Sequence, residues 1–515
     1  MANPTLLSRV AFGAGSGQYA EDKDRIHKSV RVLDDKGLVL VPFASYGSWN
    51  GGSCAQGQSG IQLIDMARDS LTLRGIAPQH GQPRRAIVMG DRMLGVSDRN
   101  VTTFDIANRA APVKKAEMDL ANPAYRMTPV NGQLASITND WWTSEVMLSL
   151  TPRANADDAD VTGKVSLASL AEQSANLCSG RGGAWAEWYS ARLFTQGNHV
   201  IVTVPVRSYT DTSSSGKLVV GVVDASNPAA PVLVSKSEIA MTTRQNGYGG
   251  YWGFFDGYGY YSYFGGSLVS GGESIVQVGN KLAYIENDTE YAQASNGFYM
   301  APTIHRKLHV VDLANVAAPV VAAPVILGDS LGSFPLNVQG NTVLSSRWVR
   351  GSVTGKVKFY VDRVDLGGAI PSRLPSVNTP GSLVAVDATT GRYVTADYTK
   401  SAFVATSYQD CSARTAYRGR FDQNTLTCKA VDRNFKLVDV DGTRLTVRNT
   451  FTPPSQNLGG LTVSDDRIYV THYPTYDYNA QPAMPGTYVE PKRLEAGGLW
   501  SLGGLRDGRL RVVNE

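Results

Sequence analysis

A glycine- and serine-containing turn carries the first pattern that could support catalysis. GDSLG, from Gly328 to Gly332, matches the G-x-S-x-G motif, in which serine hydrolases hold a nucleophile between a strand and a helix. Here the apolar run VVAAPVIL precedes the turn and FPLNVQ follows it, and both are typical of strands. Because no helix is expected after the serine, the segment is predicted to be a turn between strands rather than a catalytic elbow.

Histidines give the second chemical pattern. His305 and His309 have the spacing of a helical metal pair, but their segment TIHRKLHVVD is typical of a strand. Residues four apart on a strand are separated by about 13 Å, so these two imidazoles are not expected to share an ion. The other histidines are dispersed, and we expect them to be structural; they are His27, His80, His199 and His472.

Aspartates form two clusters that resemble calcium loops in part. ANADDADVTG contains Asp157, Asp158 and Asp160, and VDVDG contains Asp439 and Asp441. An EF-hand loop ends in a bidentate glutamate, and counting from Asp439 that position holds a threonine. No cofactor is therefore predicted, with calcium at the first cluster left as an open alternative.

An aromatic segment is the strongest candidate for binding. NGYGGYWGFFDGYGYYSYFGG, within the predicted insertion 241–267, has an aromatic side chain at nearly every second position. Tyrosine and tryptophan offer large faces that stack on sugar rings or anchor a protein partner. The alternative is that these rings pack as an extra hairpin, and Trp141 and Trp142 invite the same two interpretations. The candidate ligand-binding residues are Tyr248, Tyr251, Trp252, Phe254, Tyr258 and Tyr260.

Four cysteines bear on the compartment. Cys411 and Cys428 bracket the predicted insertion 408–430, and we expect a disulfide between them. Cys54 and Cys178 either pair or stay free, and the sequence does not separate the connectivities. Disulfides are typical of oxidising compartments, so an extracytoplasmic location is favoured over a cytosolic one. The N-terminus MANPTLLSRVAFGAG has no signal-peptide pattern, and no transmembrane segment is predicted.

A repeated octet organises the chain around these features. DIANRAAP begins at Asp105, DASNPAAP at Asp224 and DLANVAAP at Asp312, and each follows an apolar run and precedes a valine. Asp and Asn side chains bond nearby backbone and favour turns, so each unit reads as strand, polar turn, strand. Weaker copies follow the apolar runs that end at Asp65, Asp365 and Asp439.

A second repeated element is a tight turn between two short apolar runs upstream of each octet. It occurs eight times, at Gly37, Gly90, Gly132, Gly197, Gly279, Gly340, Gly391 and Asp466. Eight such hairpins predict an all-β fold, a single β-propeller of eight four-stranded antiparallel blades, with seven blades as the alternative. We expect one domain over residues 1–515, little helix, and an arm or closing strand at residues 1–25.

Two of the octets lie within the stretches VVDASNPAAPV and VVDLANVAAPV. These stretches resemble the repeats of bacterial surface propellers with LVIVD-type repeats. This resemblance covers about five of the eight units well and implies a secreted or cell-surface propeller. The resemblance implies no catalytic residues.

Charge narrows the choice of partner. The 49 basic and 45 acidic residues leave a net charge of +4, too small a bias to indicate nucleic acid. We therefore expect a non-enzymatic extracytoplasmic propeller that binds a protein or a glycan through its insertions. The alternative is a carbohydrate-active hydrolase or lyase whose site lies at the mouth of the central channel, with residues from distant blades.

Overall fold

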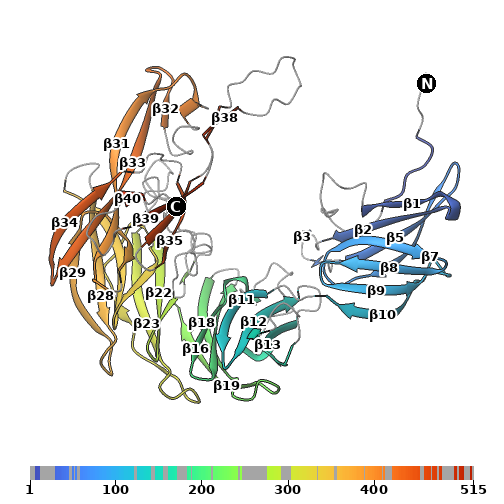
Figure 1. Ribbon diagram of the computed structural model, residues 1–515, viewed down its shortest axis with the longest axis horizontal. Coiled ribbons are helices and arrows are strands. Elements are labelled where there is room, and N and C mark those ends of the chain that lie inside the picture. The colour runs from blue at the N-terminus through green and yellow to red at the C-terminus, as the bar shows by residue number, and fades with distance from the viewer. Residues whose placement is uncertain are drawn as a thin grey trace. The chain divides into compact units, whose positions relative to one another are not determined.

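The computed structural model divides the chain into two compact units, Met1–Gln245 and Asn246–Glu515 (Figure 1). It describes residues 6–11, 29–45, 49–50, 53–54, 58–120, 124–140, 145–154, 161–170, 183–186, 188–209, 213–241, 244–245, 275–290, 303–332, 334–352, 357–387, 389–408, 410–411, 420–452, 458–464, 467–472, 475–477, 492–495, 498–503 and 511–512.

The first unit contains four antiparallel sheets, called blades 1 to 4 in chain order. Blade 1 consists of β1 (Arg31–Leu33), β2 (Leu38–Ser45), β5 (Gln58–Met66) and β6 (Leu71–Pro78). Blade 2 consists of β7 (Pro83–Met89), β8 (Arg92–Ser97), β9 (Asn100–Asp105) and β10 (Val113–Asp119). Blade 3 consists of β11 (Ala124–Val130), β12 (Gln133–Asp140), β13 (Glu145–Pro152) and β14 (Gly163–Ser166). Blade 4 consists of β15 (Gly183–Ala186), β16 (Arg192–Gln196), β17 (His199–Tyr209), β18 (Ser213–Asp224), β19 (Val232–Ala240) and β20 (Arg244–Gln245).

The second unit contains blades 5 to 8. Blade 5 consists of β21 (Ile275–Val278), β22 (Lys281–Glu290), β23 (Thr303–Asp312), β24 (Val320–Val321) and β25 (Val325–Ile326). Blade 6 consists of β26 (Leu336–Gln339), β27 (Thr342–Arg350), β28 (Val357–Asp365) and β29 (Ser372–Thr379). Blade 7 consists of β30 (Ser382–Val386), β31 (Tyr393–Val404), β32 (Arg420–Asp422), β33 (Thr427–Asp441) and β34 (Arg444–Phe451). Blade 8 consists of β35 (Leu458–Ser464), β36 (Arg467–His472), β39 (Gly498–Gly503) and β40 (Arg511–Val512).

Helix is scarce in the described residues, as predicted. Two small hairpins complete the strands, β3 (Trp49–Asn50) with β4 (Ser53–Cys54) and β37 (Thr475–Asp477) with β38 (Lys492–Glu495). The named helices are single 3-10 turns, η2 (Asp34–Lys36), η4 (Ala168–Leu170) and η5 (Trp188–Ser190).

The predicted inner hairpins are confirmed as the turns between the first two main strands of each blade. Glycine occupies the left-handed region in seven of them, from φ 53° at Gly37 to 70° at Gly132 and Gly391. This conformation is costly for residues with a Cβ, which is why glycine recurs there. The eighth predicted turn, at Asp466, lies outside the described residues, but Ser464 and Arg467 pair on either side of it.

The octets are confirmed as the turns between the third and fourth strands. Asp105, Asp224 and Asp312 each accept a hydrogen bond from the backbone N–H two residues later, at 3.1, 2.8 and 2.8 Å. The octet asparagines repeat this geometry; Asn108 Oδ1, for example, accepts from Ala110 N–H at 3.1 Å. These bonds are stronger to an ionised carboxylate, and the one from Ala107 N–H holds the pKa of Asp105 below its usual value.

The order of strands and turns defines a β-propeller fold with eight blades, as the repeats predicted. In each blade the main strands pair antiparallel in chain order, as the separate sheets of Figure 1 show. Apolar side chains that alternate along the strands form cores between facing sheets. The core between blades 1 and 2 contains Leu40, Leu63, Met93 and Phe104, all fully buried.

Blades 1 and 2, blades 3 and 4, and blades 5 and 6 are joined by hydrogen bonds at their turns. Arg109, in the octet of blade 2, donates to Lys36 O at 2.9 Å and to Asp65 at 2.6 Å in blade 1. Between blades 3 and 4 the donor belongs to the earlier blade instead: Asn131 Nδ2, in the glycine turn of blade 3, donates to Ala225 O in the octet of blade 4 at 3.1 Å. Lys281 of blade 5 likewise donates to Leu366 O of blade 6 at 2.8 Å.

A glycine on the outer strand of the preceding blade receives the octet. A Cβ on Gly75 would lie 2.5 Å from Ala110 O, and one on Gly163 would lie 2.3 Å from Pro228 O. Real Cβ atoms do not approach carbonyl oxygens so closely. At these two junctions, between blades 1 and 2 and between blades 3 and 4, the octet therefore docks in space that a side chain would fill.

The two edges of each blade differ in their connections. Short turns join the strands at the edge that carries the glycine turns and the octets, called the turn edge. Antiparallel order puts the other connections at the opposite edge, called the loop edge. Long segments leave there, between Ser45 and Gln58, Ala240 and Ile275, Glu290 and Thr303, Val404 and Thr427, and His472 and Gly498. All the predicted insertions thus belong to the loop edge.

The N-terminal residues 6–11 are described but form no strand. Ser8 Oγ accepts a hydrogen bond from Leu71 N–H of β6 at 3.0 Å. Leu6 and Leu7 are exposed. Pairing of this segment with the last strand, and the single domain over 1–515, stay predictions.

We expect Gly75→Ala to lower the free energy of unfolding by about 1–3 kcal/mol, because the added methyl group overpacks the contact with the octet. Urea unfolding followed by circular dichroism measures this. Gly368→Ala is the matched control, since its Cβ would meet nothing closer than 3.6 Å. Equal midpoints for the two variants would contradict the docking of the octet.

Candidate functional site

Blade 5 follows the predicted aromatic binding segment in the chain. The aromatic candidates Tyr248 to Tyr260 lie outside the described residues, as do Trp141 and Trp142. Their segment joins β21 at Ile275, which pairs with Tyr284 of β22. Ile275 and its partner Tyr284 therefore belong to the first pair of described strands after the aromatic segment.

One face of blade 5 carries a ladder of ionisable side chains. In the β22–β23 register, Tyr284 is opposite His309, Glu286 is opposite Lys307, and Asp288 is opposite His305. Alternate residues of a strand share a face, so all six belong to the same side of the sheet. The opposite side carries Ile285 and Leu308 into the core shared with blade 6.

The inner end of this ladder is a buried contact between a carboxylate and an imidazole. Glu286 Oε2 lies 2.7 Å from His309 Nε2, and both side chains are buried. The Tyr284 ring lies 6.4 Å from the imidazole between centroids. Lys307 Nζ is 3.9 Å from the other oxygen of Glu286. A carboxylate that orients an imidazole is an arrangement used in general acid–base catalysis.

The outer end is more exposed. His305 Nδ1 lies 3.0 Å from Asp329 Oδ1, so His305 and His309 contact different carboxylates, in keeping with their predicted separation.

The serine of the GDSLG motif, Ser330, is buried, and its hydroxyl donates to Gly332 O at 2.6 Å and accepts from Trp348 N–H at 3.3 Å. GDSLG is thus a turn held by its serine, as predicted, rather than a nucleophile elbow.

A second charged cluster connects blades 5 and 6. Arg306 of β23 places Nη1 3.2 Å from Asp362 Oδ2, and both side chains are almost completely buried. Arg306 Nη2 also donates to Ser345 Oγ at 2.6 Å. From the other side, Arg347 Nε lies 3.2 Å from Asp362 Oδ1 and its guanidinium lies 4.4 Å above the Tyr360 ring.

This cluster is electrostatically unbalanced. Burial lowers the pKa of Arg306 to about 10; Asp362 opposes that change and Arg347 adds to it. Asp362 Oδ1 also accepts a hydrogen bond from Ser376 Oγ at 2.5 Å, and Arg373 Nη2 lies 3.8 Å from the same oxygen. One carboxylate therefore neutralises several guanidinium groups, and its loss would leave buried positive charge uncompensated.

The metal candidates have other roles or lie elsewhere. Asp157, Asp158 and Asp160 lie outside the described residues. The carboxylate of Asp439 accepts from Arg392 Nε at 2.8 Å and from Arg448 Nε. Across the described ranges, no group of three His, Cys, Asp or Glu side chains is arranged to hold a metal ion.

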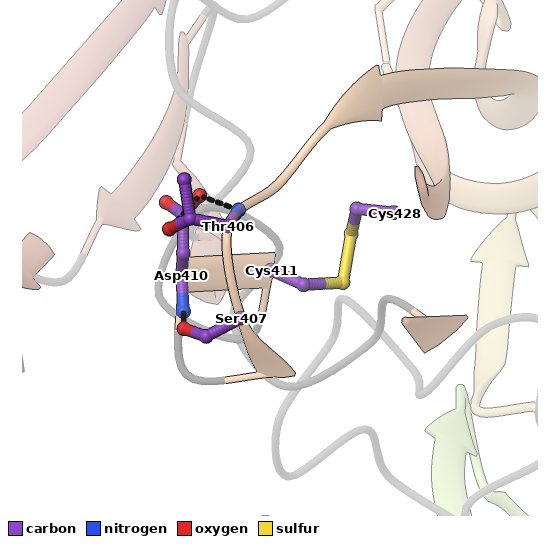
Figure 2. The surroundings of a disulfide bond; sticks show 5 residues. All are labelled: Thr406, Ser407, Asp410, Cys411 and Cys428. Atoms are coloured by element: carbon purple, nitrogen blue, oxygen red, sulfur yellow. Dashed lines mark hydrogen bonds between the residues drawn. A yellow bond between two sulfur atoms is a disulfide. The ribbon is translucent and has the colours of Figure 1, made fainter. Parts of the chain in front are cut away.

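The predicted disulfide between Cys411 and Cys428 is confirmed, and both residues are buried (Figure 2). Cys54 belongs to β4, a strand whose side chains are not described, and Cys178 lies outside the described residues. In the part of the chain that the structure describes, no helix is long and apolar enough to cross a membrane.

Sequence reasoning missed Glu286, Arg306 and Asp362. A signal was present, because KLAYIEN and VKFYVDRVD each place a carboxylate within an apolar strand pattern. Strand alternation could have marked these carboxylates as candidates for burial. It could not have named their partners, which come from other strands.

No protein-family model and no curated protein matches this chain. Among solved structures it is similar to Hsv2 of Kluyvelomyces marxianus, with 8% identity and a TM-score of 0.29, covering 80% of this chain and 93% of that one. It is also similar to BamB from Moraxella catarrhalis, with 10% identity and a TM-score of 0.28, covering 90% and 97%. Kuenenia stuttgartiensis hydrazine synthase has 9% identity and a TM-score of 0.25, covering 83% and 96%. The chain is a β-propeller protein by its strand order and turns, and these low scores add nothing to its function.

We expect Asp362→Asn to lower the free energy of unfolding by about 3–5 kcal/mol, because it leaves Arg306 buried without a counter-charge. Ser376→Ala, which removes one hydrogen bond to the same carboxylate, should cost about 1 kcal/mol. Comparison of the urea midpoints of the two variants tests whether Asp362→Asn destabilises the protein more than Ser376→Ala. An Asp362→Asn midpoint at the wild-type value would show that the cluster adds nothing to stability.

Proposed function

We propose that this chain is a non-enzymatic extracytoplasmic or cell-surface β-propeller that binds a protein or glycan partner through its loop-edge insertions. The observation that carries the proposal is the difference between the two edges of the blades. The turn edge carries the glycine turns and the octets, with a longer connection only between Pro152 and Gly163 among the described strands, whereas the longest segments leave the loop edge. Loops held on a rigid scaffold are where binding residues concentrate.

The disulfide supports the extracytoplasmic setting. Cys411 and Cys428 close a chain segment that has its own small apolar cluster, with Phe403, Ala405 and Phe421. Such bonds persist in secreted and surface proteins and are rare where thiols are kept reduced. The octets that resemble LVIVD-type repeats point to the same setting.

The aromatic segment is the proposed contact with the ligand. Its composition suits stacking on sugar rings, and the chain leads from it into β21, the first strand of blade 5. A glycan is therefore the first ligand to test at this segment.

On a glycan and polysaccharide array we expect wild type to bind a defined subset of glycans. A variant with Trp252→Ala, Tyr258→Ala and Tyr260→Ala should lose that binding by about tenfold or more, because the stacking faces are removed. Met89→Ala is the control, since it deletes a large exposed side chain of blade 2 that lies outside the predicted insertions and should keep full binding. Absence of binding by wild type would remove the glycan proposal.

A carbohydrate-active enzyme is the second candidate, favoured by the Glu286–His309 pair. A glutamate fixes the imidazole, Tyr284 is adjacent, and Lys307 is near the same carboxylate. These groups could remove a proton from a bound sugar or return one to a leaving group.

This candidate predicts that a glycan bound on the array is also cleaved in solution. We expect release of reducing ends by wild type and a loss of about 100-fold or more in Glu286→Gln, which keeps the shape but not the charge. The array binding of Glu286→Gln serves as the folding control. A bound glycan that wild type leaves intact would exclude the enzyme and leave the binding proposal standing.

A further inference from the structure

The GDSLG turn of blade 5 lies against β27 of blade 6. Trp348 N–H of β27 donates to Ser330 Oγ at 3.3 Å. A Cβ on Gly328 would lie 2.5 Å from Nε of Arg347, and one on Gly332 would lie 2.6 Å from Nε1 of Trp348. The two glycines of the motif therefore leave the space that two side chains of β27 occupy. The turn seats an arginine and a tryptophan of the next blade instead of a nucleophile.

Arg347 is held in one position by this turn and by its own blade. Its guanidinium lies 4.4 Å above the Tyr360 ring, and its Nε lies 3.2 Å from Asp362 Oδ1. Among the described residues, its Nη1 and Nη2 atoms form no hydrogen bond or ion pair. The side chain is 16% exposed, so these atoms belong to a group that a ligand can reach. A fixed guanidinium with two unused donors is suited to bind an oxyanion.

Positive charge exceeds negative charge around Arg347. Asp362 forms ion pairs with Arg306, Arg347 and Arg373, so three guanidinium groups share one carboxylate. Arg306 stays charged at neutral pH, because burial lowers its pKa only to about 10. The cluster therefore carries two positive charges in excess.

The other described carboxylates of blades 5 and 6 are used elsewhere. Glu286 and Asp288 lie on the opposite face of blade 5, and Asp329 contacts an imidazole of that face. Asp312 and Asp365 accept hydrogen bonds from backbone N–H groups of their own turns, at 2.8 and 2.9 Å. Among these described residues, none forms an ion pair with the three arginines. The excess charge is thus available to a ligand.

Lys358 adds a further positive charge on the same face. In the β27–β28 register Arg347 is opposite Tyr360 and Val349 is opposite Lys358, so Lys358 and Asp362 are the two diagonal neighbours of Arg347. Diagonal neighbours are within reach of each other's long side chains, and like charges there repel. Lys358 is exposed and forms no ion pair with the described residues. An anion between the two cations would replace repulsion by attraction.

We propose that Arg347 and Lys358 bind a phosphate group, either as the free ion or as a monoester. Arg347 donates from Nη1 and Nη2, and Lys358 donates from its ammonium group. A phosphate monoester carries about −1.5 to −2 charges near pH 7 and three acceptor oxygens, which matches the excess charge and the number of donors. This site does not involve the aromatic segment or the Glu286–His309 pair, so failure of the glycan array leaves it standing.

The test is isothermal titration calorimetry on the full chain near pH 7 at constant ionic strength, with inorganic phosphate, glucose 6-phosphate and glucose 6-sulfate as probes. Wild type should bind at least one of the two phosphates with a Kd of about 1 mM or lower. Lys358→Glu should bind it about tenfold more weakly, because a carboxylate then lies beside the phosphate. Lys164→Glu is the matched control, since it makes the same charge change on an exposed strand residue of blade 3 and should bind as wild type does.

Arg347→Met tests the guanidinium itself and should weaken binding by about tenfold or more. Asp362 loses one partner in this variant, so its thermal midpoint is measured as well. Lys358 has no described partner to lose, and Lys358→Glu should keep the wild-type midpoint, which makes it decisive if Arg347→Met is unstable.

A preference of wild type for inorganic phosphate or for glucose 6-phosphate identifies the source of the phosphate group. Three results would overturn the proposal: binding of neither phosphate by wild type, equal binding by Lys358→Glu and wild type, or tighter binding of glucose 6-sulfate than of both phosphates.

Discussion

The docking of an octet against the preceding blade, between blades 1 and 2 and between blades 3 and 4, is the contact on which the packing of these blades depends. Each octet is shaped by aspartate and asparagine bonds to its own backbone, so it is rigid before it meets its neighbour. It then fits where the neighbour presents a glycine, as at Gly75 and Gly163, and is held by a polar side chain such as Arg109 or Asn131. Local turn chemistry and blade packing thus require each other.

This constraint explains why the two edges of the blades have different freedom. At the turn edge, any insertion would disturb a turn that also touches the next blade. At the loop edge the described strand ends carry no such repeated contact, and the chain tolerates long segments there, including the disulfide-closed segment of blade 7. Function in such a fold is expected at the edge that packing leaves free.

Buried charge is the second organising feature of the second unit. Blade 5 places Glu286 and His309 on one face and Arg306 on the other, and Arg306 meets Asp362 of blade 6. Removing charges from water is costly, so each pair must be matched in geometry to be tolerated. The first pair lies between β22 and β23 within blade 5, and the second joins blade 5 to blade 6.

The sequence by itself predicted the blades, the glycine turns and the octets, because turn chemistry and strand alternation act over a few residues. It favoured the Cys411–Cys428 bond, which the structure confirmed. It also set the strand character of the His305–His309 segment, and so excluded a shared ion. Only the tertiary structure decided that Glu286 meets His309, 23 residues away, and that Arg306 meets Asp362, 56 residues away. Alternation tells which face a side chain takes, whereas its partner depends on strand register and on which blade lies against that face.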